Sequence, residues 1–521
     1  MAPTSKSRLG PPSALMLPDT LTIIFECLVL DDDDDDFPRF DKSTPCDDWF
    51  PATHTCQTWR KVAIATTRIW GCIWTAMPPN LTRLFLQRSK SIPLCLYACG
   101  HESNEDTVSM VLDTHAARLQ VVQMMDFHPK WIVPLFEMPT PQLESITLTG
   151  YIEPDEWDDP EECQRCSFSA TTLHEGIPSL KYLSISGFGF ELDSPLLSNL
   201  TDLNMSFHES DGPPQFAARF APDELLRALR SMPRLLSLDF YDVLEPGSPI
   251  FRSPVALILP VLRRLKFHVE PMLDFDILRY LTLPAIQHID LQCGRVAEPT
   301  DIATVVPIIR ALLPPHDSSL TQTTVLIEAS RHDGKPQSRP ELKVKMKQTD
   351  KPPVDLAFAL VGTKCFQTED PLHMFHPLLG PIESFEFDGY AEVQQGTEPA
   401  AFVPFFRAMS EVTELLIHGL DDITFALFDT PKPPKKKGVR VPYALPSLKK
   451  ISLYQARDLT DTENLVGRVR KLLLARKALG APIDVLEIVL NRGYKSTTKS
   501  KVTPQDLKPL TKVVQVVFMS E

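Results

Sequence analysis

Hydrophobic and polar positions alternate in short segments that recur along most of the chain. A full segment begins with a proline, places an apolar residue two positions later, and ends in two apolar residues separated by a polar one, as in Pro178-Ser-Leu180-Lys-Tyr-Leu183-Ser-Ile185. Alternation with a period of two predicts a short strand with one buried face. The copies with proline are Pro141–Leu148, Pro178–Ile185, Pro233–Phe240, Pro260–Phe267, Pro284–Leu291 and Pro446–Leu453, and copies without it end at Met205, Phe387 and Ile417.

The spacing of these segments indicates the fold. They recur about every 20 to 40 residues, and helical patterns at Asp223–Met232 and Ile302–Leu313 lie between some of them. Strand, connection and strand at this interval is the signature of a leucine-rich-repeat-like solenoid. Between the copies at Pro284 and Ile382 the segment is lost, although Val325–Ile327 and Val344–Met346 alternate as strands do. We therefore expect an α/β chain with parallel strands and helical connections over residues 76–521.

The first 75 residues have helical patterns instead. One helix is predicted from five apolar residues at helical spacing: Leu17, Leu21, Ile24, Phe25 and Leu28. It should end before Asp31, because a run of carboxylates opposes the dipole at a helix C-terminus. A second helix, with Thr53 as a possible N-cap, would place Cys56, Trp59 and Ala63 on one face. A third would bring together Ile69, Trp70, Ile73 and Trp74.

These patterns resemble an F-box. The matching segments, in order, are Leu17-Pro18, Ile24-Phe25, Cys56-Gln-Thr-Trp59-Arg60 and Ile69-Trp70. The chain that follows is similar to the F-box proteins of mushroom-forming fungi, through Arg88-Ser89, Pro93-Leu94 and His115-Ala-Ala-Arg118. The resemblance implies an F-box over residues 15–75 with an inserted acidic loop at 31–51, after a disordered N-terminus at 1–14.

The resemblance also implies a function. F-box domains bind a Skp-type adaptor, which connects them to a cullin–RING ubiquitin ligase, and the attached repeat domain holds the protein substrate. The residues implied for adaptor contact are Leu17, Pro18, Leu21, Ile24, Phe25, Cys56, Trp59 and Trp70. Aromatic residues are enriched at binding hot spots, but the two tryptophans could equally form the core of the F-box itself. Two other functions stay open: a non-catalytic repeat scaffold with a vestigial F-box, and a hydrolase or metalloprotein site within residues 290–380.

Charge and composition narrow the class of partner. The net charge is −14, and the uninterrupted run Asp31–Asp36 contributes six of these negative charges. Such a balance disfavours a nucleic-acid partner, which needs a basic face against phosphate. One basic cluster, Lys435-Lys436-Lys437 within residues 430–441, is similar to a nuclear-import signal or is simply an exposed proline-rich loop. Proline is abundant (49 residues) and glycine scarce (20 residues), which is typical of stiff connections.

Residues with possible metal or catalytic chemistry are few. Cys163 and Cys166, with His174 downstream, have the spacing of half a zinc site but lack a second ligand pair. Two further sets, Cys95 with Cys99 and His101, and His373 with His376, are also incomplete. The chain has no phosphate-binding glycine loop and no nucleophile elbow. We therefore expect no enzyme activity, cofactor or metal. No signal peptide or membrane segment is visible in the sequence, so we expect the cytoplasm or the nucleus.

Overall fold

A computed structural model describes part of the 521-residue chain, which forms two compact units: Met1–Phe220 with Glu224–Leu235, and Ala221–Asp223 with Leu236–Glu521. We refer to them as unit 1 and unit 2. The predicted division at residue 75 is not tested by these units and stays a prediction. The described residues are 18–30, 50–100, 105–127, 135, 139–150, 167–168, 177–187, 189–190, 195–207, 219–245, 256–269, 272–293, 307–308, 311–312, 320–330, 339–348, 355–361, 384–388, 412–418, 445–454, 462–478, 480–490 and 508–520.

Unit 1 begins with short helices. These are α1 (Pro18–Leu30), η2 (Phe50–His54), α3 (Gln57–Ala65) and η3 (Thr67–Trp70), which we call the helical cluster. As predicted, α1 ends before Asp31. The predicted N-cap was wrong: Thr53 lies inside η2, where its hydroxyl donates to the carbonyl of Phe50, and Cys56 is the N-cap of α3.

The third predicted helix was also partly wrong. Only Ile69 and Trp70 are helical, in η3, whereas Ile73 and Trp74 belong to the strand β1 (Cys72–Trp74). The same four residues satisfy a helical spacing, but β1 pairs in parallel with β2 (Leu94–Cys99), with Trp74 opposite Tyr97. Pairing with a distant strand therefore overrides the local helical pattern.

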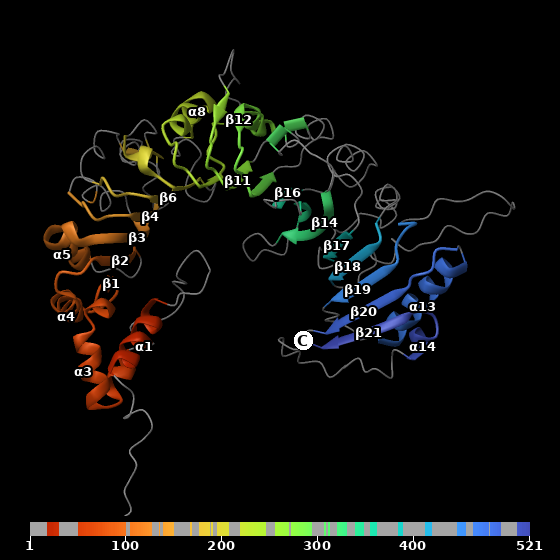
Figure 1. The fold of residues 1–521 in the computed structure, drawn as a ribbon, viewed down its shortest axis with the longest axis horizontal. Helices are drawn as coiled ribbons and strands as arrows, with labels where there is room; N and C mark the ends of the chain where they lie inside the picture. Colours follow the sequence, from red (N-terminus) through yellow and green to blue (C-terminus); the bar gives the residue numbers. More distant parts are fainter. Residues whose placement is uncertain are drawn as a thin grey trace, which may run out of the picture. The chain divides into compact units, whose positions relative to one another are not determined.

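A parallel sheet forms the rest of unit 1. Its strands pair in the order β1, β2, β3 (Leu119–Phe127), β4 (Ser145–Gly150), β6 (Tyr182–Ser186) and β8 (Asp202–Ser206). Figure 1 shows these strands following one another along the unit. The connections contain α4 (Pro79–Ser89), α5 (Glu105–His115), η4 (Ala116–Arg118), η6 (Pro195–Asn199) and a parallel pair of β5 (Ser167–Phe168) with β7 (Gly189–Phe190), and α8 (Pro222–Arg230) comes after β8.

The recurring proline forms a turn that starts each strand. The N–H of Leu143 donates to the carbonyl of Thr140, and Leu235 bonds Met232 in the same way. Proline therefore occupies the second position of a four-residue turn, where its fixed φ is favourable. In β9 (Ser237–Tyr241) the strand after the turn buries alternate residues, with Leu238 and Phe240 each 1% exposed, whereas β4 and β6 each bury three residues in a row. The turn and the alternation together explain the repeated segment.

Unit 2 continues this design. Its strands pair in parallel as β9, β11 (Arg264–Val269), β13 (His288–Cys293) and β16 (Asp355–Val361), and again as β14 (Leu320–Ser330), β17 (Ser384–Asp388), β18 (Glu414–His418), β19 (Lys450–Tyr454), β20 (Val485–Leu490) and β21 (Gln515–Ser520). Other elements are η8 (Met272–Tyr280), α13 (Thr462–Ala478), α14 (Lys508–Thr511) and the parallel pair β10 (Leu257–Ile258) with β12 (Leu281–Thr282).

One strand of unit 2 departs from the parallel pattern. The predicted strands around Val325–Ile327 and Val344–Met346 are confirmed as parts of β14 and of β15 (Arg339–Gln348). However, β15 runs antiparallel to both β14 and β16. Fewer than ten residues separate these strands in the sequence, whereas a crossover between parallel strands needs about a dozen residues or more. The short connections thus force two hairpins into an otherwise parallel array.

Candidate functional site

Aromatic packing holds the helical cluster together. The ring of Phe25 on α1 meets the indole of Trp59 on α3 edge to face, with centroids 5.7 Å apart. Leu21 and Phe25 are both 0% exposed. This face of α1 is therefore buried by contacts within the chain. Burying each such side chain contributes about 1.5–3 kcal/mol to stability.

Trp70 lies at the centre of the contacts around η3. It is 1% exposed, and its Nε1 donates a 2.8 Å hydrogen bond to the carbonyl of Ala63 on α3. Phe85 of α4 packs edge to face against the indole at 4.8 Å, and the guanidinium of Arg88 lies 4.3 Å from the ring centroid. Trp70 thus joins the helical cluster to α4.

The residues predicted to bind an adaptor differ in their exposure. Leu21, Phe25 and Trp70 are buried, which favours the alternative that Trp70 belongs to the core of the cluster. Pro18 is exposed, whereas Ile24, Cys56 and Trp59 are partly exposed. Leu17 lies outside the described residues. Their contact with an adaptor stays a prediction, and the side chains able to make it without rearrangement are Pro18, Ile24, Cys56 and Trp59.

Two exposed apolar side chains of the cluster were missed from the sequence. Ile23 of α1 is 61% exposed and Ile64 of α3 is 43% exposed. A signal for Ile23 existed, because a residue two positions after Leu21 projects from nearly the opposite side of a helix, at about 100° per residue. Large apolar side chains on the surface of a small helical cluster are candidates for a protein contact.

The motif residues after the cluster form a structural junction. Arg118 donates from Nε to the carbonyl of Ile92 (3.0 Å) and from Nη2 to Oγ of Ser89 (2.8 Å). Ser89 is fully buried and in turn donates to the carbonyl of Leu86. Burial, followed by the charge of Arg118, lowers the pKa of His115. The structure therefore brings together the Arg-Ser and His-x-x-Arg segments, and it assigns them to holding α4, β2 and η4 in place.

The sheet of unit 1 carries an uncharged row of side chains on one face. One row of residues in register crosses all its strands: Trp74, Tyr97, Gln123, Thr147, Ser184 and Asn204. The rings of Trp74 and Tyr97 stack at 4.3 Å with an interplanar angle of 11°. Oε1 of Gln123 is buried and has no hydrogen-bond partner within the described part of the chain. Trp74, Tyr97, Gln123 and Asn204 are partly exposed, but Thr147 and Ser184 between them are only 3% and 7% exposed, so the row is not a continuous surface for a ligand.

The corresponding face of unit 2 carries charges instead. Lys266 of β11 pairs with Asp239 of β9 at 3.7 Å, and the next strand places Asp290 in register with Lys266. The rings of Tyr241 and His268 are 3.8 Å apart. The row described in unit 1 is thus uncharged, whereas the strands of unit 2 carry paired charges.

A second ionic group of unit 2 is centred on Lys450. Its Nζ lies 2.6 Å from a carboxylate oxygen of Glu414 and 3.2 Å from one of Glu487. The hydroxyl of Ser452 donates to Glu487 at 2.7 Å. That hydrogen bond, and then the contact with Lys450, lower the pKa of Glu487, so its carboxylate stays ionised beside the ammonium. The group joins β18, β19 and β20 and bears one net negative charge.

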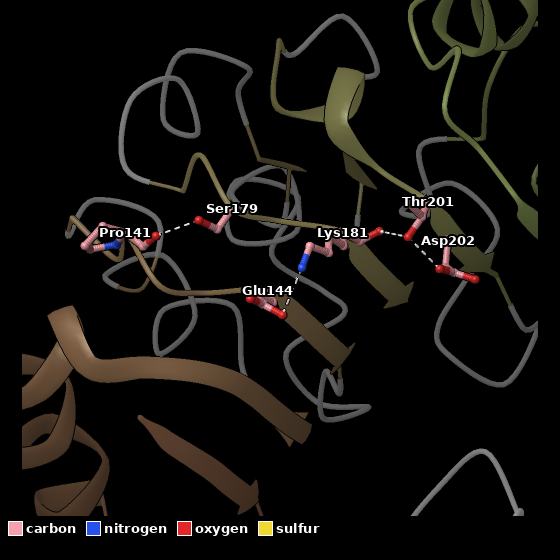
Figure 2. A network of polar contacts seen from close by, with 6 residues as sticks. All are labelled: Pro141, Glu144, Ser179, Lys181, Thr201 and Asp202. Atoms are coloured by element: carbon pink, nitrogen blue, oxygen red, sulfur yellow. Dashed lines mark hydrogen bonds and ion pairs between the residues drawn. The ribbon is translucent and has the colours of Figure 1, made fainter. Parts of the chain in front are cut away.

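The turns that precede the strands are linked by polar contacts, which Figure 2 shows for unit 1. The carbonyl of Glu144 accepts the N–H groups of Lys181 and Tyr182, and the carbonyl of Lys181 accepts those of Thr201 and Asp202. The carboxylate of Glu144 also lies 3.2 Å from Nζ of Lys181. Both of these side chains are well exposed, so the ion pair adds at most about 1 kcal/mol. The backbone hydrogen bonds, more than the side chains, therefore hold these turns together, and their role is structural.

Several predicted features fall outside the described residues. These are Cys163, Cys166 and His174, His373 and His376, His101, the acidic run Asp31–Asp36 and the basic loop at 430–441. The described residues contain no cluster of three or more His, Cys, Asp or Glu side chains suited to a metal ion. Among the helices that the structure describes, none is long and apolar enough to cross a membrane.

Comparisons with known proteins give little further information. No family model matches the chain, and no curated protein matches it. Among solved structures, the chain is similar to the leucine-rich repeat-containing protein LegL7 from Legionella pneumophila, at 13% identity and a TM-score of 0.29. The match covers 74% of this chain and 93% of LegL7.

Proposed function

We propose that this chain is the substrate-recognition subunit of a cullin–RING ubiquitin ligase. In this proposal the helical cluster binds a Skp-type adaptor, the adaptor connects it to a cullin, and the strand array holds a protein substrate. The chain supplies no acid, base, nucleophile or cofactor, and its contribution is to hold the substrate near the ubiquitin carrier. Neither a nucleic acid nor a membrane is part of the proposal, and its setting is the cytoplasm or the nucleus.

The observation that carries the proposal is the packing of the helical cluster. The segments that resemble an F-box meet through Phe25 with Trp59, which are 34 residues apart in the sequence, and through the nearer pair of Trp70 with Ala63. With its core filled in this way, the cluster leaves Ile23 and Ile64 exposed. Apolar side chains on a helical surface suit a helix-on-helix interface with an adaptor.

Binding to the adaptor tests the proposal directly. The full chain is co-expressed with a Skp-type adaptor, and the affinity of the purified proteins is measured by calorimetry. We expect a one-to-one complex at micromolar concentration. Replacing a central apolar contact by a charge should weaken it about tenfold or more, so Ile23→Asp is the test variant.

The chain offers a matched control for this variant. Ile258, on β10 of unit 2, is exposed to the same extent as Ile23, at 61%. Ile258→Asp should therefore leave the affinity for the adaptor unchanged. A folded wild-type chain that forms no complex, or an equal loss of affinity in both variants, would contradict adaptor binding by the helical cluster.

A second function is favoured by the burial of the predicted contact residues. Leu21, Phe25 and Trp70 stabilise the cluster whether or not an adaptor binds. A repeat scaffold with a vestigial F-box would thus have the same core. It predicts a stable chain that stays unbound in the calorimetry experiment above.

A further inference from the structure

Cys72 and Cys95 lie opposite each other on adjacent strands of unit 1. They are Cα partners in the parallel pair of β1 and β2, and both are partly exposed. Neither is in a disulfide. Adjacent strands lie about 4.8 Å apart, which is inside the range of about 4.4–6.8 Å between the Cα atoms of disulfide-bonded cysteines. The backbone spacing therefore permits a bond between the two sulfur atoms.

The backbone holds β1 and β2 in this register. The N–H of Cys95 donates to the carbonyl of Gly71 at 3.0 Å, and the N–H of Thr75 donates to the carbonyl of Tyr97 at the same distance. The first bond lies at the start of the paired segment, beside Cys72 and Cys95, and the second lies at its end. These bonds fix the register in which Cys72 and Cys95 face each other.

The surroundings of Cys95 favour its thiolate, which is the reactive form of a cysteine. A hydrogen bond from Cys72 lowers the pKa of the Cys95 thiol most, burial acts against it, and a hydrogen bond from Tyr97 and the positive charge of Arg68 lower it further. Cys95 is therefore the candidate nucleophile of the pair, and Cys72 is the neighbouring thiol that could react with it afterwards.

We propose that Cys72 and Cys95 form a reversible dithiol–disulfide site that responds to a hydroperoxide. The Cys95 thiolate attacks one oxygen of the peroxide, so that an S–O bond forms, the O–O bond breaks, and the other oxygen leaves as water or an alcohol after taking a proton. The sulfur of Cys72 then attacks the Cys95 sulfenic acid, an S–S bond forms, and water leaves with the Cys72 proton. Two thiols lose two electrons in total, and the peroxide gains them.

The site does not depend on the proposed ligase function. In reducing compartments, cysteine pairs of this kind form disulfides transiently, as redox sensors. The disulfide would tie β1, the strand that directly follows the helical cluster, to β2. Reduction by a thiol would restore the starting state.

Peptide mapping tests the site. The purified full chain is treated with a small excess of hydrogen peroxide, its remaining thiols are alkylated, and non-reduced digests are analysed by mass spectrometry. We expect a peptide that links Cys72 to Cys95 as the predominant disulfide, on a monomeric chain, and its loss after dithiothreitol. Recovery of both cysteines as alkylated thiols, or of Cys95 oxidised without the link, would overturn the proposal.

Three variants assign the roles of the two sulfurs. In Cys72→Ser the linked peptide should be lost while Cys95 sulfenic acid accumulates and is trapped by dimedone. In Cys95→Ser, Cys72 should stay reduced at the same dose of peroxide. Cys99→Ser, on the same strand, should leave the link intact. Circular dichroism establishes that each variant is folded, and oxidation of Cys72 in the absence of Cys95 would contradict the assigned order.

Discussion

The indole nitrogen of Trp70 lies 2.8 Å from the carbonyl oxygen of Ala63, to which it donates a hydrogen bond across seven residues of sequence. The bond joins η3 to α3 inside the core of the helical cluster. Trp70→Phe would keep an aromatic ring but remove the donor and leave a buried carbonyl without this bond. We expect the free energy of unfolding to fall by about 1–3 kcal/mol, measured by urea denaturation. Trp59→Phe, at a partly exposed position, should lower the free energy of unfolding by less. An equal decrease in both variants would contradict this role of the indole nitrogen.

Gly100 occupies a position that has no room for a side chain. A Cβ there would lie 1.9 Å from the carbonyl oxygen of Asp126, a backbone atom that cannot move aside. Gly100→Ala should therefore lower the melting temperature by several degrees, since overpacking typically costs about 1–3 kcal/mol. Gly467 in α13 has no atom within 4 Å of an added Cβ, so Gly467→Ala should be neutral or stabilising by up to about 1 kcal/mol. A melting temperature of Gly100→Ala equal to that of wild type would exclude the close approach.

Arg118 makes its contacts through two different nitrogens. Nε reaches the carbonyl of Ile92 while Nη2 reaches Ser89. Lysine keeps the charge but has one terminal nitrogen in place of the planar fork, so Arg118→Lys cannot reproduce both contacts. We expect a loss of about 1–2 kcal/mol in unfolding free energy, measured in urea. Arg83→Lys, at an exposed position of α4, is the control and should change stability little. Full stability of Arg118→Lys would show that charge alone is sufficient.

The ionic group around Lys450 predicts a dependence of stability on pH. The pKa of Glu487 is lowered in the folded chain, chiefly by Ser452 and then by Lys450. Its contribution to stability is thus present above the unfolded-state pKa and is lost as the pH falls through the folded-state value. The unfolding free energy of wild type should exceed that of Glu487→Gln by about 0.5–1 kcal/mol near neutral pH, and the difference should shrink as the pH is lowered into the acid range in which the carboxylate takes up its proton. Urea denaturation at neutral pH and at a series of acid pH values measures the difference, and a difference independent of pH would refute the assignment.

The repeated strands could be predicted because their signal is local. The turn at Pro233 and the alternation of Leu238 and Phe240 lie within eight residues, and β9 occurs where they place it. The strand β1 was missed because Ile73 and Trp74 also fit a helix, and only the pairing with β2 decides between the two. Likewise, nothing local to β15 reveals its antiparallel direction, which follows from the short connections on both sides.

The candidate binding residues were harder to predict. Helical spacing correctly placed Leu21 and Phe25 on one face of α1, but spacing does not tell whether that face meets the same chain or a partner. Here the face is covered by the chain itself. The facing of Cys72 and Cys95 was equally hidden, since it depends on the register of two strands that are separated by α4.

The backbone bonds at the turns have a consequence for how such a chain changes over generations. The backbone carbonyl of Lys449 accepts hydrogen bonds from the N–H groups of Asp484 and Val485. The carbonyl of Arg263 accepts those of Gln287 and His288 in the same way. Strand register is therefore fixed at the turn and is indifferent to the length of the preceding connection. Connections can lengthen, shorten or acquire new sequence while the sheet keeps its alignment. The architecture thus separates the part that must stay constant from the part on which selection for new partners can act.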